Sequence, residues 1–270
     1  MLYNFLVDSH CHLKDLEEEG ISADYAVNFA KNNGVFAINN VCGNINDFEK
    51  ILEISCKFKN VFCCIGQHPE NVIEQIPTIE SVVEKTKHDL VIGIGESGLD
   101  YHYCNDSNNI KLQKINFINH IEIARQSNLP LIIHSRECDN DMIDILESEY
   151  KNQEFKMLLH SFSSGKELVK TCLDLNGYVS LSGMITFKNA ENIREIVRTL
   201  PIDRLLVETD SPFLAPVPMR GKVDQPAYVK YTAKYLSELL NATFENIQNT
   251  TTKNFFDFFE KAKKTFVMEF

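Results

Sequence analysis

Short apolar runs recur along the chain, and most of them are separated by a segment long enough for one helix. Two of the runs, residues 129–133 and 156–159, are apolar almost throughout, as expected for parallel strands that are buried on both faces. We interpret eight such runs as strands, at residues 4–10, 34–41, 61–66, 90–95, 129–134, 155–160, 177–181 and 204–207.

The intervening segments carry apolar residues at spacings of three and four, which is typical of amphipathic helices. They lie at residues 24–32, 46–58, 110–126, 138–150 and 166–173, and two further helices, at residues 228–240 and 243–264, are expected to pack on the outside. Eight strands alternating with helices predict an α/β fold, a TIM-type (β/α)8 barrel. Because no Gly/Ser linker or low-complexity segment divides the chain, we expect a single domain over residues 1–270.

Side chains that bind metals or phosphate recur at the carboxyl ends of the predicted strands. In a barrel of this kind these ends converge on one face, which is where active sites lie. The residues are His10 and His12 after the first strand, His68 after the third, Glu96 after the fourth, His134 and Arg136 after the fifth, His160 after the sixth, and Glu208 and Asp210 after the eighth.

These histidines and carboxylates predict a metal site. His10 and His12 are two residues apart, so both side chains project to the same side of an extended segment, whereas Cys11 points the opposite way and is expected to pack. Imidazole groups suit Zn, Mn or Fe, and carboxylates also permit Mg. A lone histidine is more often a satisfied polar residue, and we interpret His120, inside the predicted helix 110–126, as a helix-surface or packing residue.

Composition and charge narrow the possible functions. The net charge of −11 argues against broad electrostatic capture of nucleic acid, so any phosphate must be gripped locally. We find neither a signal peptide nor an apolar run near the roughly 20 residues that a membrane helix requires. The eight cysteines show no paired C-x-x-C spacing and are interpreted as reduced thiols. We therefore expect a cytoplasmic protein with no membrane association and no obligate protein partner.

Several motifs resemble those of the TatD-like metal-dependent hydrolases, within the amidohydrolase-type barrels, and the match runs nearly end to end. The motifs are DSHCHL at residues 8–13, GQHP at 66–69, GESGLDY at 95–101, IHSR at 133–136, HSFSSG with one additional serine at 160–165, ETDSPFL at 208–214 and APVPMRGK at 215–222. The resemblance implies phosphodiesterases that act on DNA ends, commonly described as 3′ to 5′ deoxyribonucleases. DNA or another phosphodiester is the implied substrate.

The resemblance also implies a site for two divalent ions, which we expect to be Zn, Mg or Mn. The implied ligands are His10 and His12 for one ion, His134 and His160 for the other, Glu96 as a bridge between them, and Asp210 beside the attacking water. Glu96 and Asp210 are therefore the predicted catalytic residues.

Phosphate binding at the barrel mouth is predicted for His68, Arg136 and Arg220. A planar guanidinium group donates two parallel hydrogen bonds to phosphate oxygens, which favours arginine for this task. A structural ion pair that braces the barrel mouth is an equally good interpretation of either arginine. For His68, Pro69 stiffens the loop behind the ring, which favours the functional interpretation.

Three residues depart from the family pattern: Gln67 where a small or apolar residue is common, Ser97 where Ile or Cys is common, and Asp224 where Asn is common. None removes a ligand, but Asp224 adds negative charge near the predicted mouth. Two other enzymatic functions stay open, hydrolysis of an amide, ester or lactone in a small molecule and deacylation of D-aminoacyl-tRNA. A metal-binding protein without turnover is a further alternative, although every expected ligand position is occupied.

Overall fold

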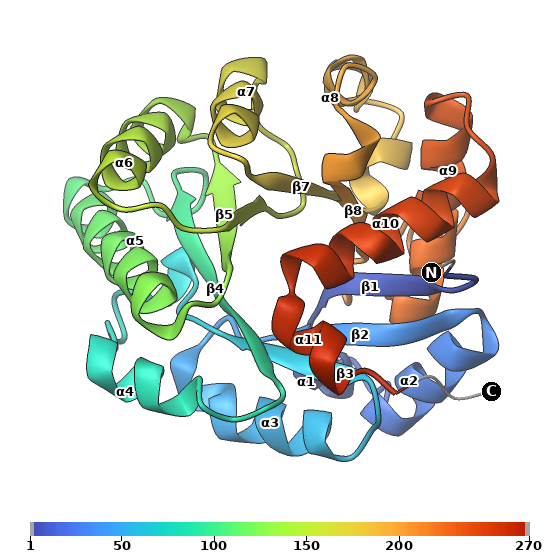
Figure 1. Cartoon of the computed structure of the whole chain (residues 1–270), viewed down its shortest axis with the longest axis horizontal. Helices are drawn as coiled ribbons and strands as arrows, with labels where there is room; N and C mark the ends of the chain where they lie inside the picture. Colours follow the sequence, from blue (N-terminus) through green and yellow to red (C-terminus); the bar gives the residue numbers. More distant parts are fainter. Residues whose placement is uncertain (1–2, 268–270) are drawn as a thin grey trace.

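The protein is a barrel of eight parallel strands, in which each strand pairs with the next one along the chain (Figure 1). The computed structural model describes residues 3–267. The strands are β1 (Leu6–Cys11), β2 (Val35–Val41), β3 (Val61–Ile65), β4 (Val91–Asp100), β5 (Leu131–Arg136), β6 (Met157–Leu159), β7 (Tyr178–Leu181) and β8 (Leu205–Val207). The predicted (β/α)8 fold is therefore confirmed.

The barrel closes between β8 and β1 through backbone contacts just beyond the end of β8. Cys11 and Ser211 form an isolated parallel bridge. The amide of His12 donates a hydrogen bond to the carbonyl of Ser211 at 2.8 Å. The amide of Asp210 donates to the carbonyl of His10 at 2.9 Å. This seam places Asp210 beside the two histidines at the end of β1.

The fourth strand differs most from its predicted bounds. It runs from Val91 to Asp100, whereas the sequence predicts an end at Gly95. Its second half stays paired with β5, with Gly98 opposite His134. A Cβ atom at Gly98 would lie 1.9 Å from the carbonyl oxygen of His134, so only glycine permits the two strands to approach this closely. The longer strand holds Glu96 and Asp100 beside β5.

Helices surround the strands, and several begin at side-chain caps that the sequence supplies. Ser22 Oγ accepts from the amide of Tyr25, and Asp106 accepts from two amides at the start of α5. Among residues 3–267, none of the helices combines the length and the hydropathy that a membrane span requires. The helices are α1 (Leu13–Glu18), α2 (Ala23–Asn32), α3 (Phe48–Cys56), α4 (Ile79–Lys85), α5 (Ser107–Ser127), α6 (Asp139–Asn152), α7 (Lys166–Asp174), α8 (Glu191–Val197), α9 (Val229–Leu239), α10 (Phe244–Phe258) and α11 (Glu260–Thr265), with 3-10 turns η1 (Ile45–Asp47), η2 (Pro69–Asn71), η3 (Gly183–Thr186), η4 (Ile202–Arg204) and η5 (Pro226–Tyr228). The sequence analysis did not identify α1, α4 or α8.

Alternate residues along each strand face two different cores. Residues such as Ile132 and Leu206 pack together inside the barrel. Their neighbours Leu131 and Leu205 pack against the surrounding helices. This alternation follows from the pleat of a strand and explains why the predicted strands are continuously apolar.

Aromatic residues of α10 and of the residue after it close the amino-terminal end of the barrel. Phe255, Phe256, Phe258 and Phe259 belong to the interior core and are at most 1% exposed. Figure 1 shows α10 and α11, in red, crossing in front of the strands. The predicted single outer helix over residues 243–264 is therefore wrong on two points. The helix is interrupted at Phe259, and its aromatic residues face into the barrel because they cover the strand ends.

Substitution of Phe259 tests this closing role. We expect Phe259→Ala to lower the free energy of unfolding by about 3–5 kcal/mol, because it leaves a cavity in the core at the amino-terminal end of the barrel. Urea unfolding monitored by circular dichroism measures the change. The control Tyr25→Ala, at a side chain that is 56% exposed, should change stability by no more than about 0.5 kcal/mol. A loss of that small size for Phe259→Ala would show that the ring is not part of the core.

Candidate metal centre

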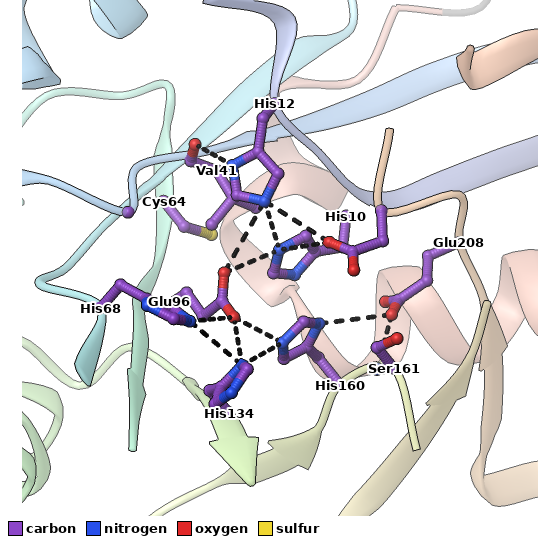
Figure 2. A network of polar contacts seen from close by, with 12 residues as sticks. His10, His12, Val41, Cys64, His68, Glu96, His134, His160, Ser161 and Glu208 are labelled. Carbon is purple, nitrogen blue, oxygen red and sulfur yellow. Dashed lines mark hydrogen bonds and ion pairs between the residues drawn. The ribbon is translucent and has the colours of Figure 1, made fainter. Parts of the chain in front are cut away.

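Six side chains from five strand ends converge inside the carboxyl-terminal mouth of the barrel (Figure 2). They are His10 on β1, His12 directly after β1, Glu96 on β4, His134 on β5, His160 after β6 and Asp210 after β8. Most of them line a cavity of about 800 Å³, which also contains His68 and Arg136. The structure therefore brings together all six residues that the resemblance implies as ligands.

The two carboxylate oxygens of Glu96 face two different pairs of histidines. Oε1 lies 2.6 Å from Nε2 of His160 and 2.8 Å from Nδ1 of His134. Oε2 lies 3.2 Å from Nε2 of His10 and 3.7 Å from Nε2 of His12. Ligands that share one ion at about 2.0–2.2 Å lie roughly 3 Å apart, so each histidine pair with its Glu96 oxygen has a spacing that fits a cation. The nitrogen and oxygen donors suit Zn or Mn and also permit Mg.

Three histidine rings have an accepting oxygen behind the nitrogen that points away from the cavity. Nε2 of His134 lies 3.0 Å from the carboxylate of Asp100, and Nδ1 of His12 lies 3.2 Å from the carbonyl of Val41. Both partners only accept, so these nitrogens carry the proton, and the opposite nitrogens would be the ones to bind a metal ion. Nδ1 of His160 faces the carboxylate of Glu208 at 3.4 Å in the same sense (Figure 2). Outer partners of this kind orient metal-binding histidines.

His68 has the opposite arrangement. Its Nδ1 accepts a hydrogen bond from the amide of Glu70 at 3.2 Å and thereby caps η2. The proton of neutral His68 therefore sits on Nε2, which lies 3.4 Å from Oε1 of Glu96. This ring offers a donor to the cavity and no lone pair.

Asp210 lies on the side of the centre formed by β1. Its Oδ1 is 3.5 Å from Nε2 of His12 and 3.7 Å from Nε2 of His10. Burial by itself favours the neutral carboxyl, but the hydrogen bond with His12 and the charges of His160 and His10 hold the pKa of Asp210 below its usual range. The carboxylate is therefore ionised at neutral pH.

Two carboxylates lie behind the histidines. Glu208 was expected among the ligand-type side chains at the strand ends, whereas Asp100 had no predicted role. Asp100 has a pKa of about 2, because the hydrogen bond from His134 outweighs the opposing effect of burial. Glu208 is fully buried and accepts from the amide of Ser161 at 2.6 Å and from the hydroxyl of Ser180. Both residues occur in the motifs, but only their position beside a histidine of another strand, which the sequence does not display, indicates their function.

The two predicted phosphate-binding arginines lie in different places. Arg136 lines the cavity, with its guanidinium 4.7 Å from the centre of the Tyr103 ring. Arg220 is not among the lining residues, because its guanidinium stacks on Phe187 at 3.9 Å. Cys11 is buried against the helices, as expected from its side of the strand.

Two carboxyl groups are buried behind the centre. Asp8 and Asp224 are both 0% exposed, and Oδ2 of Asp224 has no hydrogen-bond partner within residues 3–267. Burial raises the pKa of Asp224 to about 9 and that of Asp8 to about 8, and the charges of neighbouring carboxylates add to the effect. The sequence analysis expected Asp224 to add negative charge near the mouth. Because the residue is buried, it is instead neutral near pH 7.

Comparisons with known proteins bear on the fold and the family of this chain. The family described as TatD related DNase matches residues 7–260. The chain is 37% identical over 250 residues to a Bacillus subtilis protein named uncharacterized metal-dependent hydrolase YabD, covering 92% of this chain and 96% of the relative. It is 38% identical over 254 residues to the Escherichia coli hydrolase YcfH, named in the same way, covering 93% and 94%. The crystal structure of YjjV, a TatD homologue from Escherichia coli, has the same fold, with a TM-score of 0.83 and 22% identity over 96% of this chain and 99% of that one.

Replacement of Asp224 tests how much the buried carboxyl group lowers the free energy of unfolding. The unfolded chain releases this proton near pH 4 and the folded chain near pH 9, so the stability of the protein falls as the pH rises between these values. We expect Asp224→Asn to raise the free energy of unfolding by roughly 1–3 kcal/mol at pH 8 and by less at pH 5. Urea unfolding at both pH values in metal-free buffer measures the difference.

The exposed Asp203 supplies the control for this experiment. We expect Asp203→Asn to change stability little at either pH, since its carboxylate is solvated in both states. Two results for Asp224→Asn would contradict the assignment of a neutral buried carboxyl group. One is a gain in stability that is the same at pH 5 and pH 8, and the other is a loss of stability at pH 8.

Proposed function

Because this chain belongs to the family of TatD-related metal-dependent hydrolases, we propose that it hydrolyses phosphodiester bonds at DNA ends, as a 3′ to 5′ exodeoxyribonuclease. The observation that carries the proposal is the Glu96 carboxylate, whose two oxygens face separate histidine pairs at 2.6–3.7 Å. A carboxylate in this position suits a pair of cations, the arrangement that stabilises both the attacking and the leaving oxygen of a phosphodiester.

The ligand set divides into two halves that share Glu96. We assign His134 and His160 to one divalent ion, and His10 and His12 to the other. Such ions supply a water of lowered pKa and neutralise charge on the reacting phosphate. The chain's own contribution is the orientation of the imidazoles, which the partners behind them determine.

Asp210 is the proposed proton acceptor. Its carboxylate lines the cavity, is ionised at neutral pH, and lies within 4 Å of both β1 histidines. A general base needs hydrogen-bond reach to the water that it deprotonates, and this position provides it. On the opposite side of Glu96, Nε2 of His68 lies 3.2 Å from Nδ1 of His134 and 3.4 Å from Oε1 of Glu96. Once a metal ion occupies these two acceptors, the Nε2 proton would be free to bind a phosphate oxygen.

Arg136 is the proposed contact for the substrate phosphate. We find no ion-pair partner for its guanidinium within residues 3–267, so the charge is available to a ligand that enters the cavity. The rim also carries Asp15, Asp47 and Glu70, which repel a long polyanion. Lys14 also lines the cavity, but it pairs with Glu18 and Asp47. A cavity with so little unpaired positive charge against an acidic rim suits the end of a strand better than an extended duplex.

Metal removal and Asp210→Asn test the mechanism together. We expect EDTA to abolish the shortening of 5′-labelled single-stranded DNA. We expect Asp210→Asn to lower kcat by about 10²–10⁴-fold, because an amide does not accept the proton. Circular dichroism should show that the variant keeps its fold. Activity that persists in chelator would contradict the metal mechanism.

The same preparations distinguish the proposal from its alternatives. Metal-loaded protein is incubated with DNA, with D-aminoacyl-tRNA, and with a panel of small esters, amides and lactones. Turnover of D-aminoacyl-tRNA or of a small molecule, without DNA cleavage, would show that the enzyme hydrolyses a bond other than a phosphodiester. A protein that binds metal but turns over none of these substrates would contradict an enzymatic role.

Arg136→Gln tests the phosphate contact. We expect KM for single-stranded DNA to rise by about 10–100-fold with a smaller change in kcat, because a charged hydrogen bond contributes about 1.5–3 kcal/mol. The control is Arg198→Gln, at an exposed guanidinium paired with Glu191 outside the cavity, and it should leave KM unchanged. If Arg136→Gln lowered the melting temperature without raising KM, Arg136 would be a structural brace.

A further inference from the structure

One face of α5 carries a stripe of buried polar side chains where an amphipathic helix normally presents apolar ones. The stripe consists of Asn109, Gln113, Asn116 and His120, spaced by four, three and four residues, and each member is at most 2% exposed. Residues at these spacings share one helix face. Buried polar groups are normally hydrogen-bonded, so the partners of this stripe indicate its role.

Gln113 binds the backbone of Asp100 at both of its polar groups. Its Oε1 accepts from the Asp100 amide at 2.8 Å, and its Nε2 donates to the Asp100 carbonyl at 3.0 Å. The side chain of Asp100 in turn accepts from Nε2 of His134 at 3.0 Å. Gln113 thus determines where Asp100 lies, and Asp100 orients His134.

Asn116 connects the backbone on either side of the cavity wall. Its Nδ2 donates to the carbonyl of Gln67 at 2.8 Å and to Oγ of Ser97 at 3.1 Å. Gln67 immediately precedes His68, and Ser97 immediately follows Glu96. One amide group therefore connects the segments that carry His68 and Glu96, whose side chains lie 3.4 Å apart in the cavity.

His120 completes the stripe as a neutral ring. Its Nδ1 donates to the carbonyl of Asn116 at 2.8 Å, and its Nε2 accepts from the amide of Gln67 at 3.1 Å. Burial lowers the pKa of His120 to about 4, so the ring remains uncharged at neutral pH. The expected surface or packing role of this histidine is therefore incomplete, because its Nε2 binds the segment that leads into His68 while its Nδ1 is held by the backbone of α5.

We propose that the polar stripe of α5 is the positioning element for one half of the centre, setting His68, Glu96 and His134 relative to one another. The proposal rests on the proposed function only in that Glu96 and His134 hold a metal ion. The stripe members do not touch the cavity, so they act through Gln67, Ser97 and Asp100. Loss of such an outer partner typically weakens metal binding or activity by about 10–100-fold.

Asn116→Ala removes the connection between Gln67 and Ser97. We expect the dissociation constant of Mn²⁺, measured by calorimetric titration of the metal-free protein, to rise by about 10-fold or more. We expect kcat for single-stranded DNA to fall by about 10–100-fold with a smaller rise in KM, because Glu96 and His68 are displaced while the phosphate contact at Arg136 is retained. Ser97→Ala removes one of the two acceptors and should show the same effects to a smaller degree.

Ile121→Ala is the matched control, because Ile121 is 0% exposed on the same helix and lies outside the stripe. It should destabilise the protein through a cavity but leave Mn²⁺ affinity and kcat unchanged at 20 °C. Equal losses of Mn²⁺ affinity and kcat in Asn116→Ala and Ile121→Ala would show that the stripe only stabilises the fold, and this result would overturn the proposal. Unchanged metal affinity and kcat in both Asn116→Ala and Ser97→Ala would also overturn it.

The double variant Asn116→Ala/Ser97→Ala examines whether the two residues act as a unit. Since Ser97 contributes through Asn116, we expect the double variant to be no worse than Asn116→Ala alone. If the losses of Mn²⁺ affinity in the two single variants added fully in the double variant, Ser97 would not act through Asn116. The Mn²⁺ titration decides the proposal even if the wild-type protein turns over no DNA, so failure of the proposed nuclease activity remains distinguishable.

Discussion

Burial of the Glu96 carboxylate is the constraint on which the rest of the centre depends. The group is only 3% exposed, and a buried charge is costly unless opposite charges compensate it. Burial alone would favour the neutral form, but His160, His68 and His10 hold the pKa of Glu96 well below its usual range. Bound cations would compensate the same charge. The barrel must therefore bring cationic or metal-binding groups to Glu96 from several strands at once, and this requirement explains why the site lies where the strands converge.

The two halves of the centre are supported by different parts of the fold. His10, His12 and Asp210 lie on the seam between β8 and β1, where backbone hydrogen bonds join residues that are two hundred positions apart in sequence. His68 and His134 are instead supported from behind by side chains of α5. The seam is formed by backbone hydrogen bonds, whereas the support from α5 comes from polar side chains.

The strand pattern and the residues at strand ends were predictable, because burial on both faces and convergence at one rim follow from elementary geometry. The orientation of each side chain was not. Gln113 and Asn116 were read as part of an ordinary amphipathic helix, since periodicity identifies a helix but not the partners of its buried polar groups. Arg220 lies in a family motif, yet its stacking on Phe187 depends on the conformation of a loop. Likewise, the interruption at Phe259 reflects the need to cover the barrel floor, which local sequence does not reveal.

The aromatic floor of the barrel also bears on how the chain is made. Ribosomes deliver a protein from its amino terminus at about 5–20 residues per second, so all eight strands emerge before Phe255 to Phe259. Until those rings arrive, the inner faces of the strands have no cover at one end, and exposed apolar surface of this kind promotes aggregation. All six residues of the metal centre, of which Asp210 is the last in sequence, are thus translated before the aromatic residues that complete the interior core. Holding the nascent strands apart from other chains during that interval is a task for chaperones.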